Sequence, residues 1–184
     1  MIQEGGAKSV YKCRKDAGFS IEEAAYRVNV ASRTLIKYEH GETIPGPDVV
    51  LAMSRVYKRP WMTQIYCKEC CAIGQAYSYE VLNNVNLDPQ NIMLKLIGEM
   101  NEAQTVLNKM LEIAVNKNSR SDFTEQEWDE FIDCLHEFLD VEHNIETLKI
   151  ALNHWCDISE EIQKHNKKCL ERGYVKKEAL VRAI

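Results

Sequence analysis

The sequence is poor in the residues that mark turns between strands. It has 8 glycines and 4 prolines among 184 residues, and sheet proteins need such residues at their frequent turns. No apolar run approaches the roughly 18 residues of a membrane-spanning helix. Residues 1–10 also lack the hydrophobic stretch of a secretory signal. We therefore predict an all-α protein with no membrane segment, acting in the cytoplasm.

The motifs of common enzyme classes are missing as well. The sequence has no Gly-rich phosphate loop, no nucleophile elbow and no HExxH zinc motif. Neighbouring acids such as Asp129 and Glu130 are explained by helix capping and surface charge. We predict that the protein is not an enzyme.

The whole-chain net charge of −5 argues against nucleic-acid binding, but the charge is unevenly distributed. Residues 1–66 carry ten Lys/Arg and seven Asp/Glu, a net charge of +3. Residues 67–184 carry thirteen and twenty-one, a net charge of −8. Such segregation indicates modules with different roles. We predict a domain over 1–66, a Cys/Asn-rich linker over 67–88, and a helical domain over 89–184 that ends in a basic tail.

The first 66 residues have the pattern of short amphipathic helices. Ser20 is a predicted N-cap, and Gly41 stands where a helix C-terminus favours glycine. The expected helices cover residues 9–17, 21–28, 32–40, 48–57 and 60–66.

From residue 89 the pattern becomes that of two long helices. Alternating steps of three and four predict a coiled-coil-like seam on the first helix. This seam comprises Met93, Leu96, Met100, Ala103, Leu107, Met110 and Ala114. The residues around 116–121 break the pattern.

The second long helix has a clear start signal. Thr124 and Glu127 form a predicted capping box, with Phe123 and Trp128 as a hydrophobic staple. The apolar stripe that follows is interrupted at Glu142 and comprises Trp128, Phe131, Leu135, Phe138, Ile145, Leu148, Leu152, Trp155 and Ile162. A helical hairpin buries one face of each helix, so we predict that this domain also dimerises.

Residues 18–45, GFSIEEAAYRVNVASRTLIKYEHGETIP, contain the most specific motif. The matching positions are Gly18, Ser20, Glu22, Glu23, Ala25, Val30, Thr34, Tyr38, Glu39, Gly41 and Pro45. This segment, within residues 8–66, resembles the helix-turn-helix of the lambda-repressor-like (Xre/Cro-type) family. Two positions depart from the family pattern. Ile21 stands where a Gln usually binds the DNA backbone, and Asn29 replaces the usual turn glycine.

The resemblance implies a five-helix DNA-binding domain whose recognition helix enters the major groove. The implied base contacts are Ser32, Arg33, Thr34 and Lys37, with Arg33 placed to bind guanine. The implied DNA-backbone contacts are Arg27, Ser20, Lys12, Arg14 and Lys15. The expected partners are double-stranded DNA with a pseudo-palindromic operator and a second copy of the chain. The expected function is a transcriptional regulator, most often a repressor of the phage or mobile-element type.

The segment Cys67–Cys71 is either structural or a metal or redox site. Cys67, Cys70 and Cys71 are candidate zinc or redox residues, but a structural zinc site needs four ligands and there is no second CxxC. A missing zinc ligand could come from a histidine only if folding or dimerisation happens to bring one close to the cysteines. The candidates are His136, His143, His154 and His165. We predict no cofactor. A metal- or thiol-sensing regulator and a helical protein-interaction adaptor are the alternative functions.

Overall fold

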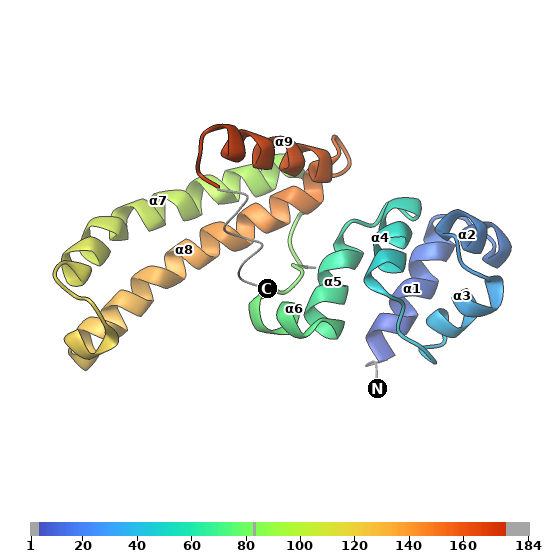
Figure 1. Cartoon of the computed structure of the whole chain (residues 1–184), viewed down its shortest axis with the longest axis horizontal. Helices are drawn as coiled ribbons and strands as arrows, with labels where there is room; N and C mark the ends of the chain where they lie inside the picture. Colours follow the sequence, from blue (N-terminus) through green and yellow to red (C-terminus); the bar gives the residue numbers. More distant parts are fainter. Residues whose placement is uncertain (1–3, 83, 176–184) are drawn as a thin grey trace.

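The computed structural model describes residues 4–82 and 84–175, and all regular structure within these ranges is helical (Figure 1). The all-α prediction is therefore confirmed. Within the same ranges, no helix is both long and apolar enough to cross a membrane. The elements are α1 (Glu4–Asp16), α2 (Ile21–Val28), α3 (Ser32–Glu39), α4 (Pro47–Val56), α5 (Trp61–Cys70), α6 (Ala72–Tyr77), α7 (Pro89–Ala114), the short 3-10 helix η1 (Arg120–Asp122), α8 (Glu125–Leu152) and α9 (Ile158–Glu171).

Helices α1 to α5 form a small bundle at one end of the molecule (Figure 1). Its centre is filled by Leu35, Met53 and Tyr57, which are the largest fully buried side chains. Ala24 and Ala25 of α2 are also buried, and their small size lets neighbouring helices approach closely. The five helices expected in this region are all present, although α1 starts earlier and α5 ends later than expected.

A buried ion pair joins α1 to α3 inside this bundle. The Arg14 guanidinium donates from Nε to Glu39 Oε1 at 2.5 Å and from Nη2 to Oε2 at 3.0 Å. Its Nη1 donates to the Phe19 carbonyl at 2.7 Å. The carboxylate raises the pKa of Arg14. The prediction that Arg14 contacts the DNA backbone is wrong, because the residue is 2% exposed and its donors are committed inside the fold.

The predicted linker over 67–88 is partly helical. Its first four residues complete α5, and α6 follows after a sharp turn at Cys71. The turn brings Gly74 so close to α5 that a Cβ there would lie 2.0 Å from the Cys67 carbonyl oxygen. The cysteine cluster is therefore part of a tight helical corner that extends the N-terminal bundle.

Helices α7 and α8 form the antiparallel hairpin that extends away from the bundle (Figure 1). The predicted capping box is confirmed, since Thr124 Oγ1 accepts the Glu127 N–H and the Glu127 carboxylate accepts the Thr124 N–H. The staple is confirmed as well, with Phe123 and Trp128 rings edge to face at 5.4 Å between centroids.

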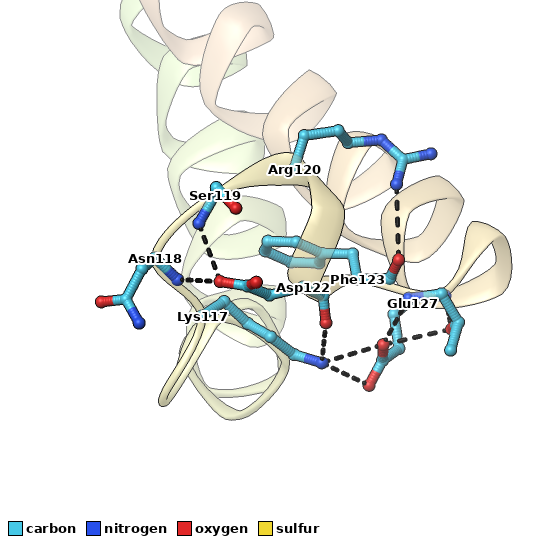
Figure 2. Close-up of polar contacts among 8 residues, drawn as sticks. Lys117, Asn118, Ser119, Arg120, Asp122, Phe123 and Glu127 are labelled. Carbon is cyan, nitrogen blue, oxygen red and sulfur yellow. Dashed lines mark hydrogen bonds and ion pairs between the residues drawn. The ribbon is translucent and has the colours of Figure 1, made fainter.

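The turn between the two helices is held by polar contacts (Figure 2). The Asp122 carboxylate accepts the backbone N–H groups of Asn118 at 2.7 Å and Ser119 at 3.0 Å. These two donors lower the pKa of Asp122. The Lys117 ammonium donates to the Glu127 carboxylate at 3.0 Å and to the Asp122 carbonyl at 2.8 Å. The direction in which the chain reverses is thus fixed locally.

The seam predicted on the first long helix is only half right. Leu96, Ala103 and Met110 are buried or half-buried, but Met93, Met100 and Leu107 are exposed. The reason is that α7 carries two parallel apolar stripes, and the predicted seam alternates between them. Only one stripe packs against α8.

The apolar stripe predicted on the second long helix, from Trp128 to Ile162, also ends earlier than predicted. Helix α8 continues through Glu142 without a break and ends at Leu152. Trp155 lies beyond that end and is 62% exposed, so its assignment to the core is wrong. Ile162 lies on the separate helix α9 and is also exposed. Residues 176–184 of the predicted basic tail lie outside the described residues.

A polar junction connects the bundle to the middle of α8. The Tyr79 hydroxyl donates to Glu142 at 2.9 Å, and its ring stacks on His143 with centroids 4.8 Å apart. His143 Nε2 lies 2.8 Å from the Glu80 carbonyl oxygen and must donate to it, because a carbonyl only accepts. Burial, followed by the bond to Glu142, raises the pKa of Tyr79 to about 12, so this donor keeps its proton at neutral pH.

The buried pair generates a stability prediction. Glu39→Ala should lower the free energy of unfolding by about 3–5 kcal/mol, because it leaves the Arg14 charge buried without its partner. The matched control is Glu23→Ala, which removes the partner of the half-exposed Arg27 and should cost less than about 1 kcal/mol. Urea unfolding followed by circular dichroism measures both. Equal losses in the two variants would show that the pair does not hold the domain together.

Candidate nucleic-acid interface

The turn between α2 and α3 is closed by local hydrogen bonds. Ser20 Oγ accepts the Glu23 N–H at 3.1 Å and caps the start of α2. Asn29 ends the helix in the left-handed conformation, with φ 61°, and the Val30 N–H donates to the Ala25 carbonyl at 2.9 Å. This pattern satisfies the last carbonyls of α2 and allows α3 to start almost at once. The two helices therefore have a fixed relative direction.

Helix α3 presents a polar face that is not used in the core. Leu35 and Glu39 point into the bundle, whereas Arg33 and Lys37, one turn apart, are exposed. Ser32 and Thr34 are only half-buried, so part of each side chain remains accessible. The predicted base contacts thus split into two exposed cations and two partly covered hydroxyl groups.

Two further residues of α3 and its cap share the face of Arg33. Ile36 is 38% exposed, and His40 is exposed with Nδ1 3.5 Å from a Glu42 carboxylate oxygen. Positions 36 and 37 lie three and four residues after 33, and position 40 lies four and three residues after them, so all four share one helix face. The sequence analysis missed Ile36 and His40, although counting the same steps from Arg33 would have found them.

The residues predicted to contact the DNA backbone differ in their exposure and in the partners they already have. Lys12 and Lys15 are exposed on α1. Arg27 is half-exposed, donates to Glu23 at 2.9 Å and lies over the Phe19 ring at 4.8 Å from its centroid. Such an exposed pair is weak and screened by salt, so a phosphate can compete for the guanidinium. These three cations, unlike Arg14, remain available at the surface.

The packing of Ile21 gives a reason for the apolar residue that stands where the family pattern has a Gln. It is half-buried and packs against the core cluster. The side chain at this position therefore adds to the apolar core, and the hydrogen bond that a Gln would give to the DNA backbone is absent from this residue.

The cysteine segment lies away from this face, at the corner of α5 and α6. Burial raises the pKa of the Cys67 thiol, and the nearby Cys71 adds to the effect. Burial and then the charge of Glu69 raise the pKa of Cys70. Cys67 lines a cavity of about 310 Å³ between α5 and α8, which His143 also borders. In the described part of the chain, no three His, Cys, Asp or Glu side chains are grouped to hold a metal ion.

Comparison with known proteins identifies one region. Residues 10–61 match a family model described as helix-turn-helix, and this range runs from within α1 to the first residue of α5, with α2, α3 and α4 inside it. No curated protein and no solved structure matches the chain.

The raised thiol pKa values generate a reactivity prediction. At pH 7.5, Cys67 and Cys70 should react with iodoacetamide more slowly than the exposed Cys156, because alkylation needs the thiolate. Since a raised pKa delays ionisation, their rates should climb only as the pH rises above the ordinary thiol value of about 8.5. Peptide mass spectrometry after timed quenching gives each rate. Faster alkylation of Cys67 or Cys70 than of Cys156 would instead favour the thiol-sensing alternative.

Proposed function

Residues 10–61 form a helix-turn-helix domain of the Xre/Cro, lambda-repressor-like type, and from this premise we propose that the protein is a dimeric repressor. Its site is a pseudo-palindromic operator of the phage or mobile-element type, and it acts in the cytoplasm without catalysis. Domains of this family bind DNA, and the proteins that carry them are typically non-enzymatic regulators. The observation that carries the proposal is the exposed face of α3, which the buried Arg14–Glu39 pair holds in place.

The proposed contacts follow from the chemistry of that face. Arg33 donates two hydrogen bonds to guanine O6 and N7 in the major groove. Ile36 offers an apolar surface that suits a thymine methyl group. Ser32 and Thr34 present hydroxyl groups to neighbouring base edges. Lys37 contacts a base or the adjacent phosphate.

Lys12, Lys15, Arg27 and the Ser20 hydroxyl complete the interface through phosphates. Ala31, at the start of α3, has no side-chain acceptor, so the first N–H groups of this helix can also meet a phosphate. One such domain makes few contacts, and a twofold dimer on two half-sites doubles them.

The acidic charge of residues 67–184 supports DNA contact through the N-terminal bundle. Residues 67–184 carry the net charge of −8 and repel the DNA backbone. Contact is therefore directed to the N-terminal bundle. The alternative of a protein-interaction adaptor uses the same two modules without DNA, and loss of all sequence-selective binding would favour it.

Arg33→Ala tests the base contact. Selection from random DNA first defines the preferred site, and gel shifts then compare variants. The variant should bind about 1–3 kcal/mol more weakly and lose preference at one base pair of each half-site. The matched control, Arg120→Ala, removes an exposed guanidinium at the far hairpin turn and should bind like the unmodified protein. Unchanged affinity of Arg33→Ala on every sequence would contradict the assignment.

Salt dependence tests the phosphate contacts. Affinity should fall steeply with salt, because each Lys or Arg that meets a phosphate releases counterions. Lys12→Ala and Lys15→Ala should weaken binding equally across sequences and reduce the log–log slope by about one each. Lys109→Ala, on the hairpin, is the control and should leave the slope unchanged. A wild-type affinity insensitive to salt would overturn the proposed binding mode.

A further inference from the structure

Helix α7 carries an apolar stripe whose side chains stay exposed in the described chain. The large side chains on or beside it are between 39 and 68% exposed. The stripe contains Met93, Ile97, Met100, Leu107 and Leu111, and Leu94 lies beside it. Figure 1 shows α8 along one side of α7 and no other helix along the C-terminal half of α7.

The stripe has the spacing of a coiled-coil seam. Positions 93, 97, 100, 104, 107 and 111 alternate steps of four and three, and only Gln104 is polar. A second set at 92, 96, 99, 103, 106 and 110 has the same spacing and is buried or half-buried against α8. One helix thus carries two seams, and the partner within the chain satisfies only one of them.

The other helix of the hairpin shows that this exposure is specific. The corresponding exposed stripe of α8 has the same spacing but is polar and mostly acidic. It consists of Asp129, Asp133, His136 and Asp140. The outer face of α8 is therefore suited to solvent, and the outer face of α7 is suited to an apolar partner.

The size of the stripe matches a self-association surface. The exposed fractions leave on the order of 600 Å² of apolar side-chain surface on each chain, the upper end of what a monomer exposes in one patch. Two copies pairing through it would bury about 1,200 Å², which reaches the range of specific stable interfaces.

The charges around the stripe also favour a second copy. Two chains that each carry −8 over residues 67–184 repel one another at most of this surface. The residues that flank the stripe along its middle are uncharged, namely Gly98, Asn101, Thr105 and Asn108. The stripe is therefore the part of α7 where two acidic domains can meet without opposing carboxylates. Gln104 is both donor and acceptor, so it can pair with its own copy and fix the register.

We propose that the exposed stripe of α7, with Gln104 near its centre, is the surface on which a second copy of the chain docks. The pairing makes a four-helix core from two α7·α8 hairpins. The proposal deepens the proposed function by naming the dimer surface. It rests on the dimer part of that function alone and holds whether or not α3 binds DNA.

Sedimentation of the full chain under reducing conditions tests the proposal. The unmodified protein should be a dimer at tens of micromolar. Leu107→Glu should raise the dimer dissociation constant at least about 100-fold, because each copy would bury an unpaired carboxylate. The matched control is Asn91→Glu, which adds the same charge at an exposed position of α7 outside both the stripe and its flanking residues, and should remain dimeric.

Ile97→Lys provides an independent variant on the same stripe and should also give monomers. Circular dichroism should show native helix content in all variants, because each change is at an exposed helix position and Glu and Lys are good helix formers. A monomeric unmodified protein would overturn the proposal, as would dimers of unchanged strength in both Leu107→Glu and Ile97→Lys.

Gel shifts keep this test separate from the proposed DNA binding. Leu107→Glu should still bind the selected DNA through Arg33, but with weaker affinity and without a two-copy complex at low concentration. A protein that dimerises through the stripe yet binds no DNA would overturn the repressor and support the dimer surface.

Discussion

The bond between Arg14 and Glu39 fixes the element on which the proposed function depends. Both side chains are almost fully buried, and the guanidinium also holds the Phe19 carbonyl just before α2. Three segments of the helix-turn-helix domain thus meet at one charged group. A buried charge is costly unless every donor is paired. The pairing therefore links α1, the segment before α2 and the end of α3 at one buried point.

The inward direction of Glu39 determines which side chains of α3 are exposed. With Leu35 and Glu39 directed inward, the helix period places Arg33, Ile36 and Lys37 outward. The same division appears at the level of the whole chain, where the basic bundle presents cations and the acidic hairpin presents an apolar stripe. The proposed phosphate-binding face and the proposed dimer surface therefore lie on different modules. The net charge of −5 is the sum of +3 over residues 1–66 and −8 over residues 67–184.

Local signals predicted much of this structure, and long-range pairing explains what they missed. The capping box at Thr124, the N-cap at Ser20 and the five short helices depend on neighbouring residues and were predicted correctly. Arg14 was assigned to the surface because its partner is 25 residues away. The seam of α7 was misassigned because two stripes share one helix, and spacing alone cannot tell which of them meets α8. Trp155 was placed in the core because the pattern continued past the end of α8.

In the proposed function, α3, held by the buried Arg14–Glu39 pair, is the surface that meets DNA. An NMR titration of the full chain with its selected DNA tests this most directly, because it locates the contact residue by residue. Binding through α3 should change the amide shifts of residues 31–40 and of residues around Lys12, Lys15 and Arg27, while the hairpin turn at 117–127 should be unaffected. Changes confined to α7, α8 or the hairpin turn, with α3 unaffected, would contradict it.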